Sequence, residues 1–137
     1  MQTASVKWIG EERFAASSPS GHAISVDSDR HSNTAPGPME LVLVALGACT
    51  ATDIVSILGK KRQELESLEV ICSGERAMEP PTVWKKLEIL YLLRGQLDDK
   101  AVRHAIQLSE DKYCSVAAML KKTAEVSWRY EIQPASS

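Results

Sequence analysis

The sequence from residue 37 to residue 59 is Gly-Pro-Met-Glu-Leu-Val-Leu-Val-Ala-Leu-Gly-Ala-Cys-Thr-Ala-Thr-Asp-Ile-Val-Ser-Ile-Leu-Gly. Pro38 suits the first position of a helix, and Glu40 in the first turn faces the positive end of the helix dipole. Gly59, followed by three basic residues, is a stop signal. Almost every residue between these signals is apolar or small, which predicts a helix of about 21 residues, buried nearly all round.

A long buried helix is difficult to cover in a chain of this size. The chain has 137 residues, which predicts a single domain over residues 1–137. We therefore expect a homodimer, in which a second subunit covers part of the helix. The longest uncharged apolar run, Leu41 to Thr52, ends at Asp53 and is shorter than the roughly 18 to 20 residues that span a bilayer. No membrane is expected as a partner.

Regular alternation of apolar and polar residues predicts strands after this helix. The pattern covers residues 68–72, 83–93 and 123–132. Two adjacent prolines in the loop Met78–Thr82 predict a turn between the first two strands, since proline cannot sit inside a paired ladder. Residues 98–108 have the apolar spacing of an amphipathic surface helix.

The N-terminal part of the chain predicts a small meander. Apolar and polar residues alternate from Ala4 to Trp8, and the turn residues Ser18–Gly21 precede a short strand around His22 to Val26. A short helical piece is expected over residues 115–122. The pattern therefore predicts helices and strands in one domain, with an antiparallel hairpin formed by the strands on either side of the Met78–Thr82 loop.

Composition and charge exclude several functions. Sixteen Lys and Arg stand against eighteen Asp and Glu, giving a net charge of -2 and no broad positive surface for nucleic acid. The first residues lack the basic start, apolar middle and cleavage site of an export signal, which predicts a cytoplasmic protein. No metal and no nucleotide cofactor are expected, since the three histidines have no metal-binding spacing and the glycines form no phosphate loop.

The three cysteines are the remaining source of chemistry. They are too far apart for a CxxC motif, and an odd number does not suit a disulfide scaffold. Cys72 lies on the face of a predicted strand that carries its apolar residues, where a small core residue would lie. Cys49 lies about three turns inside the helix, where the dipole does not reach it and burial disfavours the thiolate. An arginine from elsewhere in the dimer would be needed to make it a nucleophile.

Cys114 lies where one helix stops and another starts, a position that offers amide donors and suits a resolving thiol. The residues alone therefore leave two readings of Cys49 and Cys114 open, a redox pair or inert thiols. A pairing of cysteine with histidine, as in a cysteine hydrolase or an acyl-transfer enzyme, is a further alternative, because such pairs meet in space rather than in sequence.

Two segments carry a resemblance to a known family. Pro38–Leu58, and Lys112–Leu120 with its cysteine about 65 residues after the first, resemble the OsmC/Ohr family of stress-inducible thiol peroxidases, and its YhfA-like branch most of all. The similarity covers most of the chain. It implies an OsmC-like α+β fold, in which antiparallel sheet wraps a long buried central helix. It also implies an intertwined homodimer with two such helices at its centre and the active sites at the subunit interface.

The resemblance also implies a reaction. Enzymes of this family reduce hydroperoxides, preferentially organic ones, in oxidative or osmotic stress defence. Cys49 corresponds to the peroxidatic cysteine, which becomes a sulfenic acid, and Cys114 corresponds to the resolving cysteine, which closes a disulfide. A dithiol such as a lipoyl group would reduce the disulfide. The expected function is that of a cysteine-based hydroperoxide reductase, an antioxidant peroxidase with no cofactor.

The chain departs from the family pattern at one point. Family members pair the thiolate with an N-terminal arginine, and the arginine with a glutamate directly after the helix-start proline. Here Met39 follows Pro38, and Glu40 is displaced by one residue, about 100° around the helix. By location, Arg13 is the expected partner of the thiolate, with Arg30 behind it. The displaced glutamate motivates an alternative, a non-catalytic module that binds a small apolar or electrophilic molecule.

Overall fold

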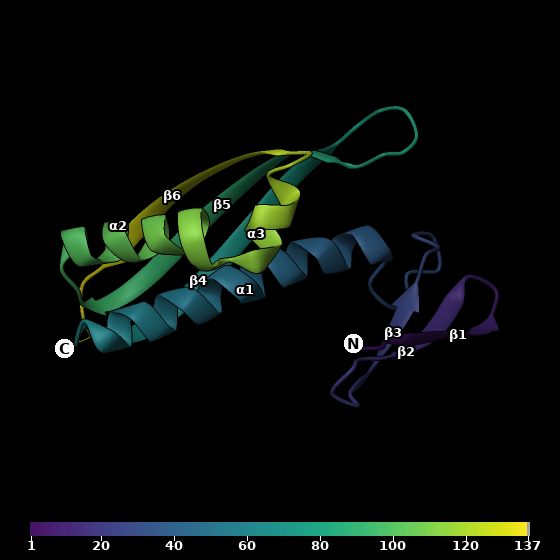
Figure 1. The fold of residues 1–137 in the computed structure, drawn as a ribbon, viewed down its shortest axis with the longest axis horizontal. Helices are drawn as coiled ribbons and strands as arrows, with labels where there is room; N and C mark the ends of the chain where they lie inside the picture. The colour runs from purple at the N-terminus through teal and green to yellow at the C-terminus, as the bar shows by residue number, and fades with distance from the viewer. Residues whose placement is uncertain (137) are drawn as a thin grey trace. The chain divides into compact units, whose positions relative to one another are not determined.

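A computed structural model describes residues 1–136, which form two structural units, one over Met1–Val42 and one from Leu43 onward. Each unit contains a three-stranded sheet. Helix α1, Pro38–Lys60, begins in the first unit and continues through the second (Figure 1). The predicted start at Pro38 is confirmed. A single domain over residues 1–137 stays a prediction.

The first unit is the meander expected from the sequence. Strands β1 (Ser5–Gly10), β2 (Arg13–Ser17) and β3 (Ala23–Asp27) pair antiparallel in the order β1-β2-β3. In the predicted turn, the amide of Gly21 donates to the carbonyl of Ser18 at 2.9 Å. Gly21 has a φ of 86°, which glycine adopts without strain.

Asp27 organises the loop that leads from β3 to α1. Its buried carboxylate accepts hydrogen bonds from the hydroxyl of Thr34 at 2.6 Å, from the amides of Thr34 and Asp29, and from the hydroxyl of Ser32. These bonds, those from Thr34 above all, hold the pKa of Asp27 well below its usual range. The carboxylate therefore stays ionised at neutral pH and fixes the path of residues 28–36.

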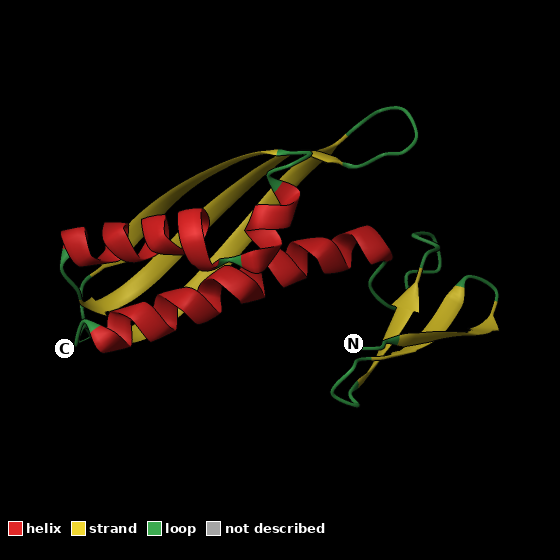
Figure 2. Cartoon of the chain, in the orientation of Figure 1, coloured by secondary structure: helices red, strands yellow, loops and turns green. Residues whose placement is uncertain are grey.

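The second unit contains a longer sheet than the pattern predicted. Strands β4 (Glu64–Arg76) and β5 (Trp84–Gln96) form the predicted antiparallel hairpin, and β6 (Glu125–Gln133) extends the order to β4-β5-β6. The expectation of a purely antiparallel sheet is wrong here, because β6 runs parallel to β5. Two parallel strands need a connection that runs back along the sheet. The helical segments between β5 and β6 form this connection, so that β6 begins beside the first residues of β5 (Figure 2).

Three helical segments connect β5 to β6. Helix α2 (Asp99–Leu108) begins after Asp98, whose carboxylate accepts from the amide of Ala101 at 3.1 Å. A π-helical turn, η1 (Ser109–Tyr113), continues the helical segment up to Cys114, where the backbone is extended and the helix breaks as expected; α3 (Ser115–Leu120) follows. Such turns are rare and occur mostly as single turns, often near functional sites.

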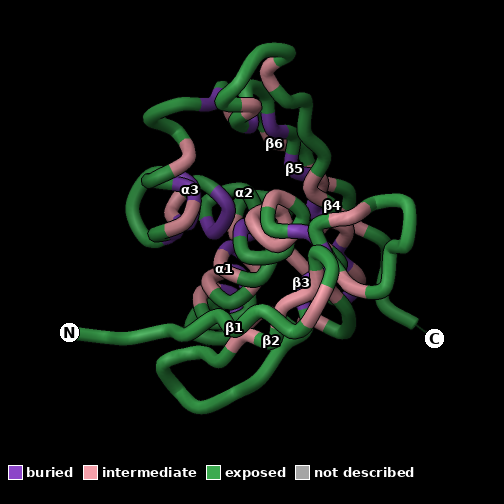
Figure 3. The backbone as a smooth tube through the Cα atoms, turned by 90° about the vertical axis from the view of Figure 1, so that its right-hand side faces the viewer, coloured by how far each residue is buried: buried purple, intermediate pink, exposed green. Residues whose placement is uncertain are grey.

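The core of the second unit lies between the sheet and the helices. One face of β5 supplies four fully buried side chains, those of Leu87, Ile89, Tyr91 and Leu93. Within one chain, α1 buries only residues spaced four apart, Leu46, Thr50, Ile54 and Leu58. The helix is thus not buried nearly all round as expected, because intermediate and exposed residues lie between the buried ones along α1 (Figure 3). Val44 remains 62% exposed. Within residues 1–136, an apolar face of α1 that includes Val44 and Val55 is left exposed.

The far end of α1 also differs from the expectation. The helix continues through Gly59 to Lys60, and the left-handed residue that follows is Arg62, with a φ of 57°. By length and composition, α1 is apolar enough to cross a membrane, with a mean hydropathy of 2.1 in an 18-residue window. However, Asp53 in the middle of the helix accepts a hydrogen bond from Ser109 at 2.8 Å, which ties the helix to η1 within the protein.

Candidate active site

Two of the predicted site residues, Cys49 and Cys114, lie together in the second unit. Cys49 is half-buried on α1, and Cys114 is 2% exposed at the start of α3. A side-chain hydrogen bond joins the two residues. The fold thus brings two thiols together that are far apart in the sequence, and both are free thiols in this structure.

The backbone around Cys114 fixes the position of its thiol. Its amide donates to the carbonyl of Ser109 at 2.8 Å and so closes the π-helical turn. Its Sγ atom accepts from the amide of Ala117 at 3.4 Å, as the cap of α3. The expected amide donor near this thiol is confirmed.

The surroundings of Cys114 favour its protonated form. Burial is the largest cause and raises the pKa of the Cys114 thiol to about 12, although the amide of Ala117 acts in the opposite direction. The hydrogen bond with Cys49 and the negative charges of Cys49 and Glu110 raise it further.

Cys72 lies on β4 beside α1 and outside this pair. A Cβ atom placed on Gly47 would be 3.4 Å from its Sγ atom, so the thiol packs against the helix backbone. Burial, followed by the charge of Glu110, raises the pKa of the Cys72 thiol to about 11. These features agree with the predicted role of a small core residue. The thiol lines an apolar hollow of about 420 Å³ with Leu43, Val44, Gly47, Ala48, Ala51 and Val70.

A buried polar network, missed by the sequence analysis, lies next to the two thiols. The hydroxyl of Thr50 is 2.7 Å from both the Tyr91 hydroxyl and the Ser109 hydroxyl. Tyr91 donates to Oε1 of Glu110 at 2.8 Å. Burial, above all, raises the pKa of Tyr91, so this hydroxyl remains a donor. The one available signal in the sequence was a threonine on an otherwise apolar helix face.

The structure pairs Glu40 with an arginine, and the arginine is Arg30. The two side chains are 2.6 Å apart, and Glu40 also accepts from the amide of Gly37 at 2.9 Å. Arg30 further donates to the carbonyl of Ala35 at 2.8 Å and to Asn33 at 3.0 Å. The displacement of Glu40 by one residue therefore does not prevent an arginine–glutamate pair.

Arg13, the arginine expected beside the thiolate, lies on β2 and has a different neighbour. Its guanidinium is 3.8 Å from the carboxylate of Glu11. Its Nε atom is buried without a hydrogen-bond partner. Arg13 belongs to the first unit and Cys49 to the second. The pairing of Arg13 with Cys49 stays a prediction.

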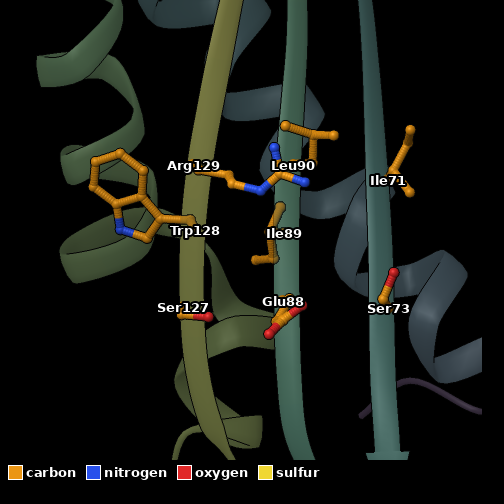
Figure 4. A pocket seen from close by; sticks show the side chains of 8 residues that line it. All are labelled: Ile71, Ser73, Glu88, Ile89, Leu90, Ser127, Trp128 and Arg129. Atoms are coloured by element: carbon orange, nitrogen blue, oxygen red, sulfur yellow. The ribbon is translucent and has the colours of Figure 1, made fainter.

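A second hollow, on the sheet, offers no comparable chemistry. It has a volume of about 220 Å³ and lies over β4, β5 and β6 (Figure 4). Its charged lining residues are Glu88 and Arg129, which form ion pairs with Lys86 and Glu131 respectively. No cysteine or histidine lines it. Across residues 1–136, no three histidine, cysteine or acidic side chains are grouped to hold a metal ion. The thiol pair is therefore the candidate site.

The fold and the thiol pair agree with one family. The family described as OsmC-like protein matches residues 31–129, which include both cysteines of the pair. This match covers more than half of the chain. The chain belongs to the OsmC-like protein family, as the resemblance of its two cysteine segments implied.

Individual relatives support the same assignment. Protein YhfA of Escherichia coli (strain K12) is 42% identical over 130 residues, covering 94% of this chain and 96% of the relative. A hypothetical protein from Aquifex aeolicus VF5 is 31% identical, with a TM-score of 0.83 and coverage of 97% of this chain and 98% of that chain. The expected YhfA-like branch is confirmed.

A more distant structure shares the fold. An organic hydroperoxide resistance protein, OsmC, from Legionella pneumophila has a TM-score of 0.68 at 14% identity, covering 96% of each chain. At this identity the similarity shows the fold alone. The expected OsmC-like α+β class is thereby confirmed.

Proposed function

We propose that this protein reduces hydroperoxides, organic ones foremost, through Cys49 and Cys114, with a dithiol such as a lipoyl group as the reductant. The observation that carries the proposal is the pairing of the buried Cys114 with the half-buried Cys49 by a side-chain hydrogen bond. The name of the Legionella pneumophila relative, a hydroperoxide resistance protein, supports the substrate class. A role in cytoplasmic stress defence belongs to the same proposal.

The thiol pair suits a two-step reaction. The Cys49 thiolate attacks the terminal oxygen of the hydroperoxide, which stays on the sulfur with its hydrogen. The O–O bond breaks, and the other oxygen takes up a proton from solvent and leaves as an alcohol. Cys49 is then a sulfenic acid. The Cys114 sulfur, having lost its proton, attacks the Cys49 sulfur, and the hydroxyl leaves as water while a disulfide forms. Two thiols of the reductant reopen the disulfide and become a disulfide themselves.

The proposal needs a cation for the Cys49 thiolate, because a thiolate in an apolar site depends on a nearby positive charge. We assign this role to an arginine of residues 1–42, from the same chain or from a partner copy. Arg13 was the residue expected from the sequence. We now favour Arg30 over Arg13 for this role, because Arg30 forms the ion pair with a glutamate that the family pattern implies, at 2.6 Å from Glu40. Glu40 then positions the arginine and does not itself contact the thiolate.

A homodimer belongs to the same proposal. The uncovered face of α1 has small residues, Gly47, Ala48 and Ala51, along its apolar hollow. Small residues allow two helices to approach closely, and a second copy of α1 would remove the exposed apolar side chains from water.

We expect light scattering on dilute protein to give about twice the chain mass of 15.0 kDa. Ala48→Glu should shift the protein toward the monomer, because it places a charge on the apolar face of α1. Lys86→Glu, on the exposed side of β5, is the matched control and should leave the dimer intact. A stable, folded monomer of the unmodified chain would contradict the proposed dimer.

The function is tested by the fate of the thiols. One equivalent of cumene hydroperoxide should link Cys49 to Cys114 within one chain, and a dithiol should reverse the link. Peptide mapping by mass spectrometry identifies the bonded pair. Cys72 should remain a free thiol throughout, since its pKa is raised to about 11. Three free thiols after peroxide treatment would contradict the proposal and favour the non-catalytic binding module.

A further inference from the structure

A cavity that the proposed reaction does not use lies between the C-terminal half of α1 and α2 (Figure 1). Its volume is about 360 Å³. Small-molecule sites in proteins have volumes of about 300 to 1,000 Å³. Residues of α1, α2 and η1 line it, and all of them belong to the second structural unit. The cavity is therefore defined within one unit of one chain.

Positive charge in the lining has no carboxylate to neutralise it. Lys60, the last residue of α1, and Lys61 both line the cavity, and within residues 1–136 neither forms an ion pair. Asp53 is the one carboxylate in the lining, and it already accepts a hydrogen bond from Ser109 at 2.8 Å. Two ammonium groups thus stand against one occupied carboxylate, and a cleft with such a surplus attracts anions.

The rest of the lining is largely apolar or aromatic. Ile57 and Leu108 are half-buried on facing helices. Tyr113 is 49% exposed, and Nζ of Lys112 lies 5.2 Å from the centroid of its ring, an attractive cation–π contact. His104 adds ring nitrogens that can form hydrogen bonds. This combination suits a molecule with an apolar body and a charged end, and not a bare ion.

The cavity lies beside the thiol pair and away from the proposed dimer face. Cys49, Asp53 and Lys60 are separated by four and seven residues, so they share one face of α1. Tyr113 directly precedes Cys114. The cavity has no lining residue in common with the apolar hollow of the proposed dimer face. A second copy that covers the hollow therefore does not need to contact the residues of the cavity.

We infer that this cavity is a binding site for a small organic carboxylate with an apolar or aromatic body. Lys60 and Lys61 attract the carboxylate, and Ile57, Leu108 and Tyr113 contact the apolar part. The inference goes beyond the proposed reaction, because none of these side chains takes part in the thiol chemistry. It can therefore be tested on the reduced protein without any hydroperoxide.

The experiment is isothermal titration calorimetry of the full chain with three probes. 4-Phenylbutyrate has both the apolar body and the charge, 4-phenylbutanamide has the body without the charge, and acetate has the charge with almost no body. We expect 4-phenylbutyrate to bind at one site per chain. The amide should bind about fivefold more weakly because it lacks the ion pairs, and acetate about tenfold more weakly because it buries little apolar surface.

The variant Lys60→Gln with Lys61→Gln locates the site. Glutamine has a helix propensity close to that of lysine, so the fold should be retained, which circular dichroism checks. Loss of two partly exposed ion pairs should weaken binding of 4-phenylbutyrate by about tenfold and leave the amide unchanged. Lys85→Gln with Lys122→Gln is the matched control, because it removes the same charge at two exposed positions that do not line the cavity.

A preference for 4-phenylbutyrate over both other probes, reduced in the Lys60/Lys61 variant and retained in the control, would support the inference. The absence of saturable binding up to about 10 mM would overturn it. Equal binding of acetate or of the amide would overturn the assigned ligand class. Unchanged binding in the Lys60/Lys61 variant, or an equal loss in the control, would overturn the location, since the probe would then occupy another surface or respond only to net charge.

Discussion

Cys49→Ser should abolish hydroperoxide consumption, whereas Cys72→Ser should leave the rate within about twofold of the unmodified protein. The reaction needs a thiolate that can attack oxygen, and serine in place of Cys49 supplies only a hydroxyl, whose proton is far harder to remove. Cys72 packs against Gly47 on α1, and its pKa is raised to about 11, so it contributes little thiolate at neutral pH. Steady-state consumption of cumene hydroperoxide with dihydrolipoamide as reductant measures both rates.

Stability must be compared alongside the rates, because both cysteines contact the core. Circular dichroism and urea unfolding of the two variants should give similar midpoints, since each substitution exchanges one sulfur for one oxygen at a half-buried position. An equal loss of activity in both variants, with an equal loss of stability, would contradict the assignment of Cys49 as the attacking thiol.

The elements that the sequence predicted correctly are those determined by local chemistry. Proline suits the first position of any helix, and glutamate in the first turn is favoured by the helix dipole, so both predicted the start of α1. Two prolines cannot lie inside a paired ladder, which predicted the turn between β4 and β5. Alternation in β6 predicted which of its faces is half-buried, and the structure has Val126, Trp128 and Tyr130 there. Alternation does not specify the neighbouring strand or its direction, so the parallel pairing of β6 with β5 was not predicted.

The site was predicted less completely, for two physical reasons. The η1 turn depends on a backbone hydrogen bond from Cys114 to Ser109, and a shift between helical types leaves little trace in side-chain periodicity. Arg30 reaches Glu40 because the bonds to Asp27 fold the intervening loop. From the sequence, only the position of Glu40 around the helix axis was known. That position does not specify how the loop before α1 folds, and the loop decides which arginine reaches Glu40. Glu110 was missed because its side-chain partners, Tyr91 and Lys121, lie on β5 and directly after α3, far from it or on another element in the sequence.

Cys114→Ser should convert a recyclable enzyme into one that inactivates itself. Cys114 is hydrogen-bonded to Cys49, so without its thiol a sulfenic acid at Cys49 would lose the paired sulfur that captures it. Excess hydroperoxide would then oxidise Cys49 further, to the sulfinic and sulfonic acids, which a dithiol does not reduce. We expect the first turnover to proceed at close to the normal rate, and later turnovers to decline.

Mass spectrometry of the intact chain should show Cys114→Ser gaining successive oxygen atoms, all of them on the peptide that contains Cys49. Cys72→Ser is the matched control, because it also removes one thiol from the second unit but leaves the hydrogen-bonded pair intact. It should form the reversible disulfide and gain no oxygen under the same conditions. Sustained turnover by Cys114→Ser with reduced dithiol would contradict the resolving role of Cys114, and would mean that the reductant itself captures the sulfenic acid.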